Sequence, residues 1–344
     1  MKHFLLDVRY RMEYLAVVCL CGVIRILPRC SLKGLARPAA FFIRCIPSAR
    51  HLVLENLKAA FPEMDEKERV RIMRASFLHM IWNLLEFFWI GGDPARIRKC
   101  YYLPADITER LKGHVAAGER IIFVNPHLGS WEASGVMAPF YAGVDMVAIA
   151  KPMRNPYLNR LLNSGRRERT AGLEIIFSRG AMRASLKALR QGRGVGTLID
   201  QNTRVRDGGV FVDFFGLPVP SSAAPAALKR YCDMHKLPAV IVYGTSLRLA
   251  DGRNTAHSAY LPKPFAEYAD DREVLQELMK ISEKFIRMHP EQYLWFYKRF
   301  QYIPPDCPAD VRSRYPDYAA EPRPSFFRKE RGRAQSVSAE EGSE

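Results

Sequence analysis

Hydrophobic and polar positions follow three different spacings along the chain, and each spacing predicts a different kind of structure. Between residues 65 and 90, apolar residues recur every three or four positions, which predicts one long helix beginning at Asp65, with Glu68 as its capping partner. Its stripe consists of Val70, Met73, Phe77, Met80, Ile81, Leu84 and Phe88. We interpret the stripe as core packing, with the lining of an acyl groove as the alternative.

The middle of the chain, from about 115 to 250, alternates short β-rich runs with helical stretches. The predicted strands are Ile121–Val124, Met146–Ala150, Leu173–Phe177, Val195–Ile199 and Pro238–Tyr243. The predicted helices are Tyr157–Arg167, Ala181–Gln191, Ala223–His235 and, further on, residues 271–289. This alternation predicts an α/β fold with a mostly parallel sheet flanked by helices.

The N-terminal pattern combines one apolar run with a high density of basic residues. Tyr14–Ile24 is an uninterrupted apolar run of 11 residues, too short to span a bilayer of roughly 30 Å as a helix. Arginines flank it at positions 9, 11, 25 and 29, and no small-residue cleavage site follows. We expect a segment that lies on an anionic membrane surface. The alternative is a buried helix with a solvated basic rim.

These patterns divide the chain into three parts. Residues 1–50 form the membrane-associated segment, 51–303 the main domain, and 304–344, rich in proline, charge and small residues, a poorly ordered tail.

Composition narrows the class of protein. The 344 residues are 48% hydrophobic and 26% charged, which excludes a largely disordered chain or a fibre. The net charge of +16 favours an acidic partner, such as an anionic bilayer, phosphorylated lipid, acidic carrier protein or nucleic acid. Seven scattered cysteines without CxxC spacing indicate a reducing compartment and neither a disulfide framework nor a zinc finger.

The most informative segment is Ile121–Glu132. A predicted strand delivers His127 at its carboxyl end, where open α/β sheets bind ligands. Gly129 permits a tight turn, and Ser130 is a plausible N-cap for the next helix. Glu132 then falls in the first helical turn, which suits a general base whose second ring nitrogen is held by a carboxylate. A structural histidine is the alternative for any single residue of this kind.

A second polar strand end occurs at Asp200 and Gln201, followed by a glycine loop and the aromatic pair Phe214 and Phe215. Asp200 and Gln201 are candidates for substrate binding. The two phenylalanines are equally consistent with an acyl-chain wall and with core packing.

No nucleophile elbow, HExxH motif or Walker loop is present in the sequence. A base without a protein nucleophile implies that the substrate supplies the attacking hydroxyl, and therefore direct group transfer without a metal. Backbone N–H groups or nearby arginines would stabilise the oxyanion. A hydrolase that uses the same pair with water is a further alternative.

Basic residues concentrate in residues 151–206, which hold 13 Lys or Arg against 3 acidic residues. Those after the strand at 146–150 are candidates for gripping phosphates or the acidic face of a carrier protein: Lys151, Arg154, Arg166, Arg167 and Arg169. A solvated basic face is the alternative. Nucleic acid is disfavoured because no recognition motif accompanies the charge.

Taken together, these motifs resemble the late lipid A biosynthesis acyltransferases of the lysophospholipid acyltransferase superfamily, whose signature is H-x4-D/E. The resemblance rests on the His127–Glu132 box, Asp200–Gln201, the run 211–216, Glu55–Leu57 with Phe61–Pro62, and Tyr293–Phe300. It extends from about residue 15 to 300. Pro126, Ser130 and Tyr297 depart from the family pattern, and they leave the acceptor lipid open.

The resemblance implies a glycerol-phosphate-acyltransferase-like fold, with His127 as base and Glu132 as its partner. Gly216 and Arg299 join the candidate substrate-binding residues through the family motifs. The implied donor is an acyl thioester of acyl carrier protein or coenzyme A, with no other cofactor. The implied acceptor is a lipid A precursor at the cytoplasmic face of the inner membrane. The alternatives are a lysophospholipid or aminolipid O-acyltransferase and a non-catalytic basic protein that binds membranes or nucleic acid.

Overall fold

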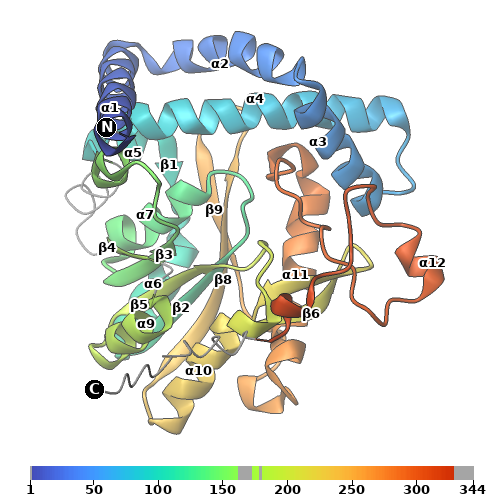
Figure 1. The fold of residues 1–344 in the computed structure, drawn as a ribbon. Coiled ribbons are helices and arrows are strands. Elements are labelled where there is room, and N and C mark those ends of the chain that lie inside the picture. Colours follow the sequence, from blue (N-terminus) through green and yellow to red (C-terminus); the bar gives the residue numbers. More distant parts are fainter. Residues whose placement is uncertain (1, 162–172, 178–179, 329–344) are drawn as a thin grey trace, which may run out of the picture.

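The structure, a computed structural model, describes residues 2–161, 173–177 and 180–328 (Figure 1). Its named α-helices are α1 (Lys2–Ile26), α2 (Arg29–Arg44), α3 (Pro47–Ala60), α4 (Glu66–Ile90), α5 (Pro94–Cys100), α6 (Ala105–Ala116), α7 (Trp131–Ala142), α9 (Ala181–Arg190), α10 (Ala224–Met234), α11 (Asp271–Met288) and α12 (Ala309–Arg312). Residues 156–161 are also helical, and the rest of the helix predicted over 157–167 lies outside the described residues.

Seven strands of the described chain form one sheet in the order β1-β9-β8-β2-β5-β3-β4. Their bounds are β1 (Tyr101–Tyr102), β2 (Arg120–Asn125), β3 (Met146–Ala150), β4 (Leu173–Phe177), β5 (Gly194–Leu198), β8 (Ala239–Arg248) and β9 (Asn254–Ala259). All neighbours are parallel except β8 and β9. The mostly parallel α/β architecture is thus confirmed. A separate antiparallel hairpin consists of β6 (Gly209–Phe214) and β7 (Leu217–Ser222).

Helices cover both faces of the sheet, which explains why the central strands are continuous apolar runs. Along β2, Ile121 and Phe123 pack into a cluster with α6 and α7. Ile122 and Val124 point the other way, into the larger core with α9, α10 and α11. This alternation buries every hydrophobic side chain of β2 and fixes its register, so the residues that follow it have a defined position.

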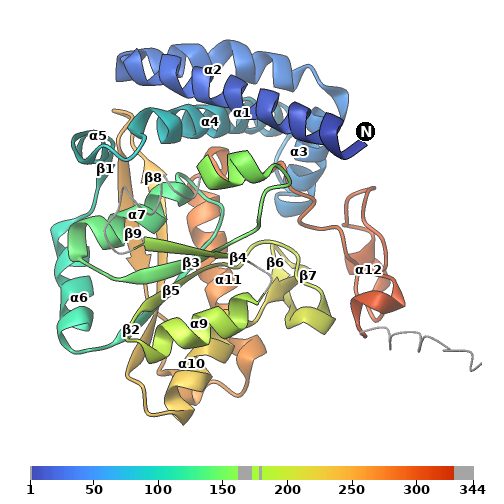
Figure 2. The same cartoon turned by 60° about the vertical axis from the view of Figure 1, so that its left-hand side comes forward.

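Helices α1, α2 and α4 form a layer at one end of the molecule (Figures 1 and 2). Helix α4 confirms the prediction for residues 65–90. The Asp65 carboxylate accepts a hydrogen bond from the N–H of Glu68, and Gly91 ends the helix with φ of 52°. Phe77 is fully buried against Phe296, as expected of core packing.

Helix α1 and much of α2 expose their apolar side chains. Ile26 is 82% exposed and Phe42 is 70% exposed, whereas Cys21 and Ile24 are the only buried residues of α1 among those whose burial is described. The alternative of a buried N-terminal helix is therefore wrong for α1. Among the residues the structure describes, no helix has both the length and the hydropathy needed to cross a bilayer.

The segment after Pro304 is ordered as far as residue 328, which corrects the expectation of a disordered tail for that part. The Tyr315 hydroxyl donates to the carbonyl of Pro218, and Arg314 donates to the carbonyl of Phe215. Asp317 pairs with His51 on α3. These contacts hold the segment against the domain, and residues 329–344 lie outside the described part of the chain.

Candidate active site

The loop that carries His127 is fixed by backbone hydrogen bonds to two other segments. The N–H of Gly129 donates to the carbonyl of Gln292 (2.9 Å), and the N–H of Ser130 donates to that of Ser246 (2.7 Å). The carbonyl of His127 in turn accepts from the N–H of Leu294 (3.0 Å). His127 therefore sits on a rigid turn rather than a mobile loop.

Only glycine fits at position 129 of this turn. Its φ is +63°, and a Cβ there would lie 1.8 Å from the carbonyl oxygen of Ser246. The sequence-based expectation that Gly129 allows a tight turn is confirmed, and the reason is both backbone conformation and the close approach of β8.

Asp200 holds His127 at two atoms. Its Oδ1 lies 2.7 Å from Nδ1 of the imidazole, and its Oδ2 accepts a hydrogen bond from the backbone N–H of His127, also at 2.7 Å. The topology produces this pair, because β2 and β5 are parallel neighbours and each residue follows the carboxyl end of its strand. Both side chains are buried. Asp200, expected to bind substrate, instead orients the histidine.

The charges of this pair stabilise each other. Burial disfavours the charged imidazolium, but the negative charge and the hydrogen bond of Asp200 outweigh it and raise the pKa of His127. Burial likewise disfavours the Asp200 carboxylate, yet its contacts with His127 lower the pKa of Asp200. Asp200 is thus ionised and requires the proton of the neutral imidazole on Nδ1, which leaves Nε2 as an acceptor.

Gln201 occupies the free side of the ring. Its Nε2 lies 3.2 Å from Nε2 of His127, so the amide N–H donates to the unprotonated ring nitrogen. The indole of Trp131 packs beside the imidazole, with ring centroids 5.4 Å apart. Gln201 therefore occupies the position from which a hydroxyl could donate to this nitrogen.

Glu132 lies in the first turn of α7, as predicted, and its negative charge contributes to the raised pKa of His127. The carboxylate at Nδ1, however, belongs to Asp200. Sequence spacing favoured Glu132 because it is near His127 along the chain. The actual partner comes from the neighbouring strand 73 residues later.

The other predicted site residues divide into exposed and buried groups. Lys151 and Arg154 are exposed after the carboxyl end of β3. Arg166, Arg167 and Arg169 lie outside the described residues.

Phe214 and Phe215 are core residues, packed against Phe300 and Trp295 respectively, which corrects the interpretation of an open acyl-chain wall. Gly216, with φ of 70°, belongs to the turn between β6 and β7.

Arg299 is buried, and its two terminal nitrogens hold neighbouring segments of the polypeptide. Its Nη1 donates to Oδ1 of Asn202 (2.9 Å) and to the carbonyl of Pro220 (3.1 Å), and its Nη2 donates to the hydroxyl of Ser221. The prediction placed it among substrate-binding residues. In the structure it links the segment after β5 to β7, with its guanidinium over Phe214.

The motifs at the two ends of the domain meet beside this site. The Asn56 side chain donates to the carbonyls of Trp295 (2.8 Å) and Tyr297 (2.9 Å). The Tyr297 hydroxyl accepts from the backbone N–H of Asn202 (3.0 Å). The motifs that contain Asn56 and Tyr297 therefore contact each other, and the second one contacts the segment that follows Asp200.

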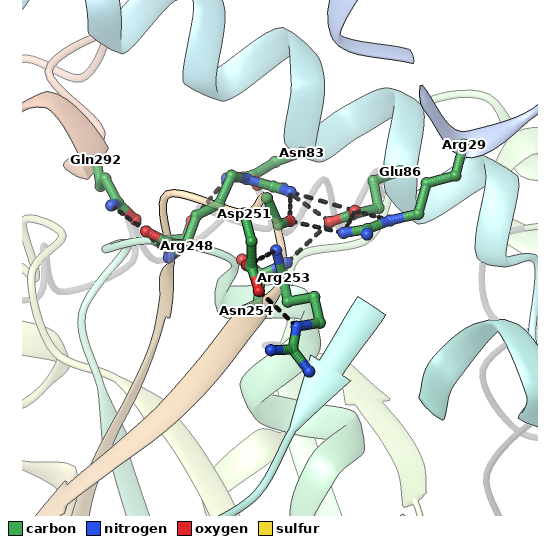
Figure 3. A network of polar contacts seen from close by, with 10 residues as sticks. Arg29, Asn83, Glu86, Arg248, Asp251, Arg253, Asn254 and Gln292 are labelled. Atoms are coloured by element: carbon green, nitrogen blue, oxygen red, sulfur yellow. Dashed lines mark hydrogen bonds and ion pairs between the residues drawn. The ribbon is translucent and has the colours of Figure 1, made fainter. Parts of the chain in front are cut away.

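A buried polar network that the sequence analysis missed lies under the His127 loop (Figure 3). Nδ2 of Asn83 donates to the carbonyl of Gly129 (2.8 Å), and Oδ1 of Asn83 accepts from Arg248 (2.5 Å). Arg248 also pairs with Glu86 at 2.7 Å, and Asn254 donates to the same carboxylate.

This network joins four elements of the fold. Asn83 and Glu86 come from α4, Arg248 from β8 and Asn254 from β9. Arg29, at the start of α2, reaches Glu86 at 3.0 Å. The lone Asn83 and Glu86 within an otherwise apolar stretch were the signal in the sequence. The network ties the layer of α1, α2 and α4 to the turn that presents His127.

Comparison with known proteins identifies the family that shares these features. A family model described as bacterial lipid A biosynthesis acyltransferase matches residues 1–302. The chain belongs to this family. It is therefore an acyltransferase, and the resemblance drawn from the motifs is confirmed.

Individual relatives differ in the acyl group that their names specify. The chain is 26% identical over 296 residues to the lipid A biosynthesis myristoyltransferase of Escherichia coli K12, covering 84% of this chain and 87% of that protein. It is 27% identical over 274 residues to the lauroyltransferase of the same organism, covering 78% and 84%. The palmitoleoyltransferase is 25% identical over 254 residues, covering 73% and 78%.

Proposed function

We propose that the protein transfers a fatty acyl chain from a thioester of acyl carrier protein to a hydroxyl of a lipid A precursor, at the cytoplasmic face of the inner membrane. Family membership supports acyl transfer in lipid A biosynthesis. The observation that carries the chemistry is the His127–Asp200 pair, because it leaves one ring nitrogen free to accept a proton.

The reaction follows from the tautomer that Asp200 selects. The acceptor hydroxyl replaces the Gln201 amide at Nε2 and gives its proton to this nitrogen as its oxygen attacks the thioester carbonyl. A C–O bond forms, the C–S bond breaks, and the departing thiolate takes the proton from the imidazolium. The products are the acylated lipid and the free thiol, so His127 returns to its starting state.

Asp200 stabilises the imidazolium in this step because its carboxylate stays ionised beside the ring. Glu132 adds a second negative charge near the ring. In this proposal Asp200 takes the orienting role that was predicted for Glu132, and Glu132 contributes only through its charge.

The oxyanion of the tetrahedral intermediate requires hydrogen-bond donors. The backbone N–H groups of His127, Gly129 and Ser130 already have partners within the protein. The proposal therefore assigns this task to side chains, with the displaced amide of Gln201 and the basic residues after β3 as candidates.

The donor is proposed from charge and chemistry. Lys151 and Arg154 are exposed beyond the carboxyl end of β3, where an acidic carrier protein or the phosphates of coenzyme A can reach them. The thioester already activates the acyl carbonyl, so the proposed step calls on no metal or prosthetic group.

Membrane association is proposed from the exposed faces of α1 and α2. Three large apolar side chains on α1, those of Phe4, Met12 and Ile26, are more than 60% exposed. Basic residues lie between them, as in helices that rest in the interface of an anionic bilayer. In this proposal the network from Arg29 to Gly129 connects the layer that rests on the membrane with the turn that carries His127.

The test is an assay of the purified protein with acyl-loaded carrier protein and a lipid A precursor in mixed micelles. We expect a lipid product heavier by one acyl chain and free carrier thiol in equal amount. Free fatty acid as the main product would identify a hydrolase instead. Acylation of an added lysophospholipid but not of the lipid A precursor would contradict the proposed acceptor, and no turnover would contradict the proposed enzyme activity.

A further inference from the structure

A basic hollow of about 480 Å³ lies between the end of α2, the start of α3 and the second turn of α4. Figure 1 shows α2 running above α4 and turning down into α3 at the end where α4 begins. Three arginines line the hollow: Arg44, Arg50 and Arg74. It is separate from the His127 site, and neither the reaction nor the network above uses these residues.

The three guanidinium groups lack acidic partners among the described residues. No aspartate or glutamate lines the hollow. Arg44, Arg50 and Arg74 take part in none of the ion pairs among the described residues. Arg44 instead lies over the ring of Phe41, 4.6 Å from its centroid. Three like charges around one cavity repel each other, and an anion bound between them relieves that repulsion.

The lining also has an apolar part, formed by Leu54, Val70 and Met73. A free inorganic anion gains nothing from contact with apolar side chains. The glycerol and first methylene groups of a lipid, in contrast, are stabilised by such contact. The rim continues into exposed Phe41, Phe42 and Ile46 on the last turn of α2 and just beyond it. Aromatic and aliphatic groups beside arginines are typical of a bilayer interface.

We propose that this hollow binds the phosphodiester headgroup of an anionic phospholipid and so anchors the α2–α3 corner in the membrane. Arg44, Arg50 and Arg74 contact the phosphate, and the apolar wall receives the glycerol end of the acyl chains. A concave site with an apolar wall fits a single lipid better than the broad acidic surface of a carrier protein. The proposal extends the membrane association suggested above, and its test measures binding without acyl transfer, so either can fail alone.

The first experiment uses monomeric dihexanoyl-phosphatidylglycerol as the probe, below its micelle concentration, in calorimetric titration of the full chain. We expect saturable binding that dihexanoyl-phosphatidylcholine does not show, and that is lost in the Arg44→Gln, Arg50→Gln, Arg74→Gln variant. The single exposed change Arg74→Glu provides a milder variant that should weaken binding at least tenfold without disturbing the fold. The absence of saturable binding to the intact chain would overturn the proposal.

The second experiment measures co-flotation with vesicles of phosphatidylcholine alone or with phosphatidylglycerol. Each basic residue near an anionic surface strengthens partitioning roughly fivefold, so the triple variant should lose on the order of 100-fold of its preference for anionic vesicles. The matched control is Arg183→Gln, Lys187→Gln, Lys236→Gln, which removes the same charge from exposed positions on α9 and after α10.

Both views place α9 and α10 at the opposite end of the molecule from α2 (Figures 1 and 2). Because exposed charges are screened by salt, the control should behave as the intact chain. Equal losses in the two triple variants would assign the preference to net charge and overturn the hollow. If the Arg44, Arg50, Arg74 variant lost binding to acyl carrier protein but kept its preference for anionic vesicles, the hollow would bind a protein partner. That result would overturn the lipid proposal.

Discussion

At the scale of single residues, the two oxygens of Asp200 determine which nitrogen of His127 is left to accept a proton, and the proposed function makes this nitrogen the base. One oxygen faces the ring N–H and the other faces the backbone N–H of the same residue. In an Asp200→Asn variant, the amide oxygen is needed at the backbone N–H, which places the NH₂ group at Nδ1. The ring then carries its proton on Nε2, where it cannot accept one from a hydroxyl.

We therefore expect Asp200→Asn to lower kcat by about 10²- to 10⁴-fold, as loss of general-base catalysis does. The ¹⁵N shifts of the histidine ring report the tautomer directly and should show the proton moved to Nε2. The matched control is Glu119→Gln, which alters another carboxylate–histidine pair, with His114, and should leave kcat unchanged. Full activity of Asp200→Asn would contradict the assigned tautomer.

If His127 is the base, its raised pKa sets the pH dependence of the reaction. Only the neutral ring can accept a proton, so activity is present above this pKa and is lost as pH falls through it. The inflection of kcat/KM on the acid side should lie above the ordinary histidine value of about 6.5. Because the charge of Glu132 raises the pKa, Glu132→Gln should move the inflection to lower pH.

The measurement is a pH–rate profile of the intact chain and of Glu132→Gln, with Glu119→Gln as the charge-matched control. An inflection below 6.5, or an upward shift in Glu132→Gln, would show that His127 is not the titrating base.

At the scale of elements, the junction between α4 and the end of β8 depends on a buried ion pair. The side chains of Arg248 and Glu86 are only 4% and 1% exposed. Arg248→Met leaves the Glu86 charge with fewer partners and frees Asn83 from the contact that aligns it with Gly129. Removing one member of such a pair costs about 3–5 kcal/mol of unfolding free energy.

We expect the free energy of unfolding, measured in urea, to fall by about 3 kcal/mol in Arg248→Met, because Arg29 and Asn254 still contact Glu86. Its kcat should fall as well, since the turn that presents His127 loses support. The matched control is Arg71→Met, which breaks an exposed pair with Glu68 on the same helix and should barely change stability. Equal stability of the two variants would contradict a supporting role for the network.

The elements themselves were largely predictable, because their signals are local. Residues 65–90 and the strands at 146–150 and 173–177 have the predicted bounds to within a residue or so. The pairing of residues from different elements could not be predicted in this way. Asp200 reaches His127 only because β5 lies beside β2, and that neighbourhood depends on the whole topology.

The sequence also did not allow us to predict which polar side chains are buried. A helical period predicts which face of α4 is apolar, but Leu84 of that stripe is exposed while Asn83 and Glu86 are buried. Their burial is possible only because Arg248 and Asn254 arrive from β8 and β9 to satisfy them. Phe214 and Phe215 show the same limit of sequence-based prediction, because hydrophobic periodicity alone does not distinguish a core residue from one that lines a ligand site.

At the scale of the whole molecule, the exposed apolar face of α1 and α2 should attach the protein to membranes through hydrophobic contact. Met12→Asp with Phe42→Asp places two charges on this face, at side chains 63% and 70% exposed. We expect weaker co-flotation with both neutral and anionic vesicles, because insertion of apolar groups does not depend on headgroup charge.

The control for this prediction is Met182→Asp with Met234→Asp, at methionines 46% and 69% exposed on α9 and at the end of α10. These changes add the same charge away from α1 and α2 and should leave binding as it is. If both double variants bind vesicles as the intact chain does, the membrane face is not on α1 and α2.

The central claim is that this chain acylates a lipid A precursor with His127 as the base. Mass spectrometry of lipid A tests it most directly, in a Gram-negative host that lacks its own late acyltransferase and expresses either the intact protein or His127→Ala. We expect a lipid A species with one additional acyl chain only with the intact protein. The same species with His127→Ala, at equal protein level, would contradict the role of His127, and an unchanged lipid A with the intact, membrane-bound protein would contradict the acceptor.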